Sequence, residues 1–178
     1  MTSKFKNTDE KEKEVYFYLG LLSTLFAKME SKLLIIVGKY ITSDFVLANT
    51  LFERNTLASN IEMLKNLNDL KDFENKTVKQ LIQKVSNIKK IRNLFIHGVW
   101  SEPIERENDI FIICRESKLD YSEKKENGNR ISRQWGSNKS TEFRLTYIRK
   151  QVDHVEEILL MQDYLIKKFE DYDYYRYL

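Results

Sequence analysis

The chain has 178 residues, enough for one domain with a real hydrophobic core. Its 42% hydrophobic and 32% charged residues are typical of a soluble globular protein, and its net charge of +3 excludes a protein that coats nucleic acid by bulk charge, although a local basic site stays open. One proline and five glycines favour long helices, and a single cysteine, Cys114, excludes an intramolecular disulfide and fits a reducing, cytoplasmic setting.

The sequence carries no signal for a membrane segment or a metal site. The first fifteen residues are polar and mixed in charge, unlike a signal peptide, and the most apolar run, Leu33–Gly38, is far too short to cross a bilayer. No group of Asp, Glu, His and Cys has the spacing of metal ligands. We therefore expect no membrane partner, no metal and no cofactor.

The first predicted element is a long amphipathic helix from about Glu10 to Tyr40. Its apolar residues recur at alternating steps of three and four, which is one face of a helix close to a heptad seam. These residues are Val15, Leu19, Leu22, Phe26, Met29, Leu33, Ile36 and Tyr40.

Two further helices are predicted in the first half of the chain. One covers Val46–Leu67, with Ser43 or Asp44 as its N-cap, and can be interrupted near residues 53–56. The Asn-rich stretch 66–76 predicts a loop or short turn. The next helix runs from about Thr77 to His97, and Gly98 is a ready C′ residue for it.

The pattern changes between residues 99 and 145. Residues 109–116 are β-branched and aromatic, which predicts a strand; residues 119–129 predict a solvated loop, and residues 130–135 and 141–145 can supply return strands. A last helix is predicted after a Thr146 cap, and the aromatic, charged tail 169–178 is either its frayed end or a segment that docks on a partner. The apolar stripe of this last helix comprises Ile148, Val152, Val155, Leu159, Ile166 and Phe169.

These elements predict a mainly α fold. We expect four or more helices in a single domain over residues 1–178, with a small β-hairpin or sheet inserted before the last helix at residues 99–145.

The third helix carries residues that do not suit a plain core helix. Its apolar side contains Val78, Leu81, Val85, Ile88, Phe95 and Ile96. Arg92 falls near the middle of that side, while Asn93 and His97 lie one turn apart along its edge. A buried unpaired charge costs several kcal/mol, so Arg92 must meet an acid, a phosphate or a wet interface.

Glu30 is a matching oddity, because it falls within the apolar stripe of the first helix. Glu30 and Arg92 could neutralise each other across a helix pair, and such a pair could be purely structural. His97 also has a structural explanation, since a charged histidine at a helix C-terminus gains about 0.3–1 kcal/mol from the helix dipole. The combination of Arg92, Asn93 and His97 on one helix is what favours a functional site.

The motif R-N-x-x-x-H from Arg92 to His97, near the end of the predicted penultimate helix, resembles the signature of the HEPN superfamily. The resemblance implies an up-and-down helical bundle of about this size, with four or more helices. Many members are metal-independent ribonucleases of toxin–antitoxin, phage-defence and CRISPR systems, and others only bind. It implies that Arg92 and His97 are the catalytic pair and Asn93 a supporting residue, and more loosely that Glu30 is the acid that some members carry on an earlier helix.

The chain departs from the family's pattern at two places. Val99 stands where members paired with a nucleotidyltransferase antitoxin carry a tyrosine two residues after the histidine, so that pairing is not implied. The strand-containing insert is also not part of the family's core fold.

Three hypotheses follow. In the first, the chain is a homodimeric endoribonuclease in which the RNA's 2′-hydroxyl attacks, because histidine moves protons near neutral pH and arginine stabilises developing charge. A dimer is expected because each chain offers one suitable histidine. The other histidine, His154, lies beside Asp153 and Glu156 and is expected on a solvated face. In the second, it is a non-catalytic HEPN-like module that binds nucleotide, RNA or protein. In the third, it is a helical scaffold with a structural Arg92–Glu30 pair. An antitoxin or another regulatory protein is a further expected partner.

Overall fold

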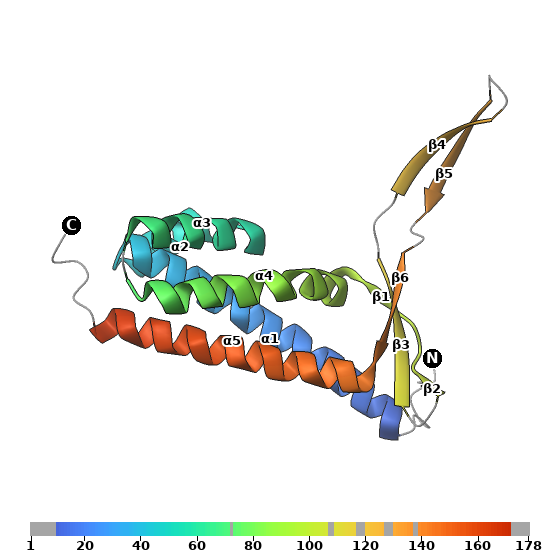
Figure 1. Cartoon of the computed structure of the whole chain (residues 1–178), viewed down its shortest axis with the longest axis horizontal. Coiled ribbons are helices and arrows are strands. Elements are labelled where there is room, and N and C mark those ends of the chain that lie inside the picture. The colour runs from blue at the N-terminus through green and yellow to red at the C-terminus, as the bar shows by residue number, and fades with distance from the viewer. Residues whose placement is uncertain are drawn as a thin grey trace. The chain divides into compact units, whose positions relative to one another are not determined.

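The computed structural model describes residues 10–71, 73–106, 109–116, 120–126, 130–136 and 139–171. Within them the chain forms five helices, with six antiparallel strands between the fourth and the last, which confirms a mainly α fold with strands inserted before the final helix (Figure 1). The helices are α1 Glu10–Ile41, α2 Phe45–Phe52, α3 Leu57–Leu70, α4 Asn75–His97 and α5 Leu145–Asp171. The strands are β1 Val99–Trp100, β2 Ile104–Arg106, β3 Asp109–Arg115, β4 Asp120–Glu126, β5 Arg130–Gly136 and β6 Ser140–Arg144.

The chain divides into two compact units. The strand unit comprises Met1–Gly20 and Asn93–Arg149, and the helical unit comprises Leu21–Arg92 and Lys150–Leu178. The single-domain organisation stays a prediction.

The helical unit is built on parts of α1, α4 and α5, which lie side by side in Figure 1, together with α2 and α3. The apolar stripe predicted for α1 is core: Leu22, Phe26, Met29, Leu33, Ile36 and Tyr40 are almost fully buried there. Tyr40 packs edge-on against the rings of Phe73 and Phe169, and its hydroxyl donates to the carbonyl of Phe73 at 3.1 Å. Burial, and then the charge of Glu74, raises the pKa of Tyr40 well above its ordinary value, so this phenol is a structural group.

Side-chain caps fix the break between α2 and α3. The Asp44 carboxylate accepts from the amides of Val46 at 2.8 Å and Leu47 at 3.1 Å, which confirms it as the N-cap of α2. The Thr56 hydroxyl accepts from the amide of Ser59 at 3.2 Å and caps α3. The predicted interruption is therefore real. The following turn is shorter than predicted, since α3 continues to Leu70 and α4 begins at Asn75.

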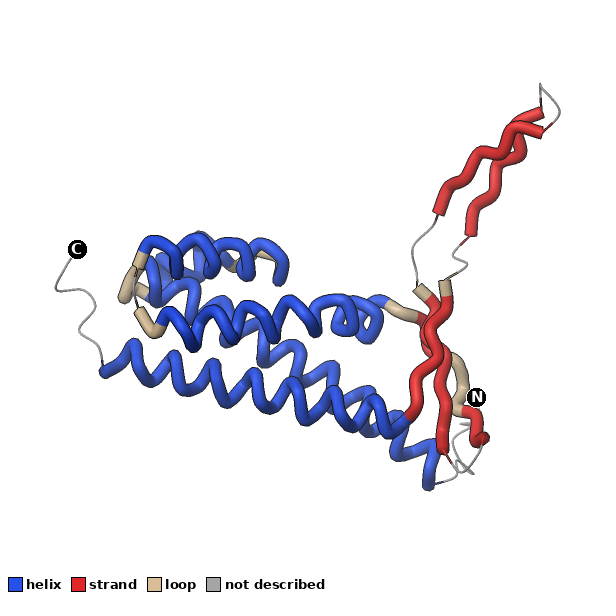
Figure 2. Tube along the Cα trace, viewed as in Figure 1, coloured by secondary structure: helices blue, strands red, loops and turns tan. Residues whose placement is uncertain are grey.

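The strand unit contains a four-stranded antiparallel sheet in which β3 is central. One edge of β3 pairs with β6, and the other edge pairs with β1 and β2. Strands β4 and β5 form a separate two-stranded sheet, and Figure 2 shows the strands in red. One face of the four-stranded sheet is core: Ile110, Ile112, Cys114 and Phe143 are buried. The rings of Phe95, Trp100 and Phe143 contact one another beneath it, with centroids 4.7–5.7 Å apart.

The insert differs from the prediction in two details. Residues 120–126 form strand β4 rather than a solvated loop, because their backbone pairs with β5. This polar segment has no alternating side-chain pattern from which a strand could be predicted. The short strands β1 and β2 were not predicted either. Two and three residues long, they are too short to show an alternating pattern, and only their pairing with β3 defines them.

The start and the buried face of α5 also differ from the prediction. The helix begins at Leu145, and the Thr146 hydroxyl donates to the carboxylate of Asp109 at 3.2 Å instead of capping the helix. The buried stripe passes through Ile158 and Leu165, while Leu159 and Ile166 are half-buried. Gln162 lies between Ile158 and Leu165 on the buried face, and its side-chain amide donates to the carbonyl of Met29 at 2.9 Å. Because Gln162 is polar, the apolar pattern of the sequence did not indicate this face. The predicted tail beyond Asp171 lies outside the described residues.

No helix in the described part of the chain has the length and apolar character needed to cross a membrane.

Candidate functional site

The predicted pair of Arg92 and Glu30 is present in the helical unit. The Nη2 of Arg92, on α4, donates to Oε2 of Glu30, on α1, at 3.0 Å, and its Nε donates to Oε1, so the ion pair is bidentate. The two side chains are 18% and 27% exposed. Each of these charged side chains therefore has the oppositely charged partner that was expected from its position in an apolar stripe. The two hydrogen bonds to the carboxylate also fix the plane of the guanidinium.

The apolar stripe around Arg92 is core rather than surface. Val78, Leu81, Val85 and Ile88 of α4 are buried in the helical unit, and Phe95 is buried in the strand unit. Ile96 is the member of the stripe that is exposed. The chain's own side chains therefore cover most of this stripe.

Asn93 and His97 belong to the last turn of α4 and to the strand unit. Both side chains are exposed, and His97 is the final residue of the helix. An exposed imidazole is accessible to a molecule that docks on the protein, which a proton-transfer role requires. Asn93, one turn earlier on the same helix, is also accessible.

Gly98 connects this helix end to the sheet. Its amide donates to the carbonyl of Leu94 at 2.8 Å, so it does follow the helix as predicted. Its φ lies outside the left-handed range, however, and the need for glycine is steric. A Cβ at this position would lie 2.1 Å from the Cys114 sulfur and 2.4 Å from the Leu94 carbonyl oxygen. Glycine thus lets α4 end directly against β3.

Gly98→Ala should consequently destabilise the protein. The added methyl group must displace a buried sulfur and a backbone carbonyl, and overpacking of this kind costs about 1–3 kcal/mol. Urea unfolding monitored by circular dichroism measures the loss. Gly20→Ala in α1 is the matched control: a Cβ there meets nothing within 4 Å, and the substitution should stabilise the helix by about 0.5–1 kcal/mol. Equal unfolding midpoints for the two variants would contradict the packing argument.

Cys114 is not placed for nucleophilic chemistry. Its thiol is fully buried and donates to the Leu94 carbonyl at 3.4 Å. Burial, followed by the charge of Glu116, raises the pKa of Cys114 to about 11, so the thiol is protonated at neutral pH. Its contribution is to the packing of β3.

The other histidine lies where the sequence predicted. His154 is exposed on α5, near the ion pair of Lys84 with Glu157 at 2.9 Å. The hydrogen bond and charge of Lys84 lower the pKa of Glu157. Among the described residues, no group of three or more His, Cys, Asp and Glu side chains is arranged to hold a metal ion.

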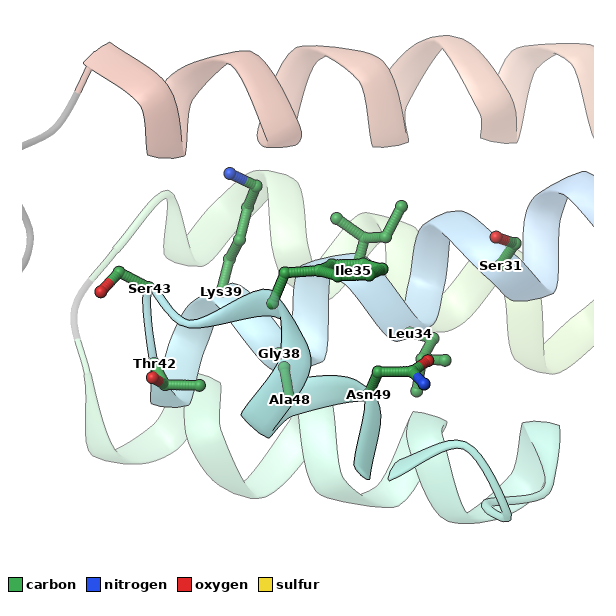
Figure 3. Close-up of a pocket in the computed structure, with 10 residues that line it drawn as sticks. Ser31, Leu34, Ile35, Gly38, Lys39, Thr42, Ser43, Ala48 and Asn49 are labelled. Carbon is green, nitrogen blue, oxygen red and sulfur yellow. The ribbon is translucent and has the colours of Figure 1, made fainter. Parts of the chain in front are cut away.

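A cavity of about 180 Å³ lies between the second half of α1 and α2 in the helical unit (Figure 3). Gly38 lets the helices approach there, since a Cβ on it would lie 2.9 Å from that of Ala48. The lining consists of Ser31, Leu34, Ile35, Gly38, Lys39, Thr42, Ser43, Phe45, Ala48 and Asn49. Lys39 is its one ionisable side chain, so the cavity lacks the acid–base pair that hydrolytic chemistry uses. No local sequence pattern indicates this cavity.

Comparison of the chain with protein-family models, with curated proteins and with solved structures found no match. The resemblance to the HEPN superfamily therefore rests on the residues from Arg92 to His97 and on their position near the end of a long helix.

Proposed function

We propose that the protein is a metal-independent endoribonuclease of the HEPN type. The observation that supports this most is Arg92, an arginine held in a half-buried, bidentate ion pair on a helix whose last residue is an exposed histidine. A guanidinium fixed by a carboxylate is oriented for a phosphate oxygen without further ordering, and an accessible imidazole can transfer protons near neutral pH.

The proposed reaction uses the substrate's own nucleophile. The 2′-hydroxyl loses its proton to a base and forms a bond to the adjacent phosphorus, while the bond from phosphorus to the 5′-oxygen breaks and that oxygen takes up a proton. His97 serves one of these proton transfers, and Arg92 stabilises the extra negative charge on the phosphoryl oxygens. Asn93 is the supporting polar group, and Glu30 is a positioning residue that acts through Arg92.

A two-fold dimer completes this proposal, since acid and base on opposite sides of the phosphate need two groups and each chain offers one suitable histidine. Light scattering should report twice the chain mass of 21.4 kDa. A strict monomer at tens of micromolar would argue against a composite site.

The direct test is incubation of the purified protein with single-stranded RNA in excess EDTA. We expect cleavage by the wild-type protein and none by Arg92→Ala. The alternative is a non-catalytic HEPN-like binding module, in which Arg92 anchors a phosphate or nucleotide without chemistry. RNA binding without cleavage would support this alternative over the enzyme.

The setting of the activity is part of the same proposal. We place it in the cytoplasm, where RNA is accessible, as a toxin or phage-defence effector under the control of an antitoxin or another regulatory protein. The open reading frames beside its gene would test this assignment, since a regulatory partner is usually encoded next to its effector.

A further inference from the structure

The outward face of the four-stranded sheet gathers arginines from three strands. Side chains alternate along β3, so Phe111, Ile113 and Arg115 lie on the face opposite the buried Ile110, Ile112 and Cys114. The register places Arg144 of β6 and Ile104 of β2 opposite Phe111, and Val99 of β1 opposite Arg115. Arg106 of β2 follows two residues after Ile104 on the same face. We call Arg106, Arg115 and Arg144 the arginine face.

Phe111 organises two of these arginines. The guanidinium carbon of Arg144 lies 5.1 Å from the centroid of the Phe111 ring, and that of Arg106 lies 5.9 Å from it. Both guanidinium groups thus lie over the ring of Phe111, which is only 7% exposed although it belongs to the outward face. Stacking on an aromatic ring holds a guanidinium extended and partly dehydrated, which lowers the cost of ordering it on a ligand.

Two acids share this face with the arginines. Glu142 pairs with Arg106 at 3.4 Å, and the Asp109 carboxylate accepts from the Thr146 hydroxyl at 3.2 Å and from the amide of Ile110 at 2.8 Å. Arg115 and Arg144 are both exposed. Three arginines and two acids, Asp109 and Glu142, lie on this face in the described part of the chain, so its formal charge is +1.

We infer that the arginine face binds the phosphate backbone of single-stranded RNA, an inference that rests on the proposed ribonuclease function. Guanidinium groups match phosphate oxygens in a fork geometry, and charge complementarity therefore favours a polyanion with regularly spaced phosphates. The exposed apolar side chains of Val99 and Ile104 flank the arginines and offer contact to unpaired bases.

The position of His97 in the same unit agrees with this role. Strand β1 begins two residues after His97, and its first residue, Val99, is the partner of Arg115 in the sheet. The arginine face therefore starts at the segment that carries the proposed proton-transfer residue. Arg115 and Phe111 are four residues apart along β3, about 13 Å, so the face spans more than one nucleotide.

The test measures binding separately from cleavage. The probe is a fluorescent single-stranded RNA with 2′-O-methyl riboses, which has no 2′-hydroxyl nucleophile, titrated at several salt concentrations. The double variant Arg115→Gln, Arg144→Gln should raise the Kd about tenfold or more, and the slope of log K against log salt should fall by about 1.4, the value for two phosphate contacts on a single strand. Arg54→Gln, which removes an exposed arginine between α2 and α3, is the control and should leave both quantities unchanged.

Each outcome decides between the inference and the proposed function. Unchanged binding by the double variant, or no binding by the wild type, overturns the arginine face. Weakened binding together with a wild-type protein that does not cleave ordinary RNA supports the face and rejects the ribonuclease. If the double variant does not fold, Arg144→Lys decides: it keeps the charge but loses the guanidinium, so it should bind more weakly than wild type with a nearly unchanged salt slope, and binding equal to wild type overturns the inference.

Discussion

His97→Ala is expected to slow RNA cleavage by about 10²–10⁴-fold, the contribution of a positioned general acid or base. The protein should stay folded, because His97 is an exposed residue at the end of α4 and its truncation removes little packing. The loss of the imidazole from the helix C-terminus costs about 0.3–1 kcal/mol at most. Single-turnover cleavage of a labelled RNA measures the rate, and urea unfolding measures the stability.

His154→Ala is the matched control for this prediction. It removes the chain's other histidine, which is also exposed and also lies on a helix, and it should leave the cleavage rate unchanged. Equal rates for wild type and His97→Ala would remove His97 from the mechanism. Equal losses in the two histidine variants would show that the effect is not specific to the end of α4.

Glu30→Ala is expected to destabilise the fold by about 1–3 kcal/mol, because it leaves a half-buried guanidinium without its carboxylate. A fully buried pair would predict about 3–5 kcal/mol, and the exposure of 18% and 27% for the Arg92 and Glu30 side chains lowers that expectation. Combining Glu30→Ala with Arg92→Ala should cost less than the sum of the single changes. Strictly additive free energies of unfolding would mean that the two side chains do not interact in solution.

The same cycle distinguishes a structural pair from a functional one. If Glu30 positions Arg92 for phosphate, Glu30→Gln should retain part of the cleavage rate, because the amide still accepts a hydrogen bond, whereas Glu30→Ala should lose more. Glu157→Ala, at a solvent-exposed pair with Lys84, is the control and should change neither stability nor rate measurably. A rate that follows stability alone across these variants would assign the pair to the scaffold.

The helical part of the fold could be predicted because its signals are local. The apolar residues of α1 follow one another at steps of three or four, and the Asp44 cap binds amides two and three residues further along the chain. The insert was less predictable, since β1 and β2 exist only through their pairing with β3. In part of α5 the predicted apolar face lay one position away from the observed buried face, because a glutamine, Gln162, occupies the buried face.

The candidate site shows the same division between local and distant information. The ion pair of Arg92 with Glu30 could be predicted from the sequence because each residue is a charge in an otherwise apolar stripe. Two opposite charges in such positions stabilise each other when they pair. The arginine face could not be found in this way. Arg144 and Phe111 are far apart in the chain and meet only through the register of β3 and β6. A single sequence does not encode that register in any local pattern.

The central claim, that RNA supplies its own nucleophile at a site containing Arg92 and His97, is tested most directly with a pair of matched substrates in EDTA. One is an RNA with a mapped cleavage position, and the other carries a single 2′-deoxy nucleotide at that position. We expect the first to be cut to a product ending in a 2′,3′-cyclic phosphate and the second to remain intact at that position. Cleavage of the 2′-deoxy substrate at the same position and rate would contradict the proposed mechanism.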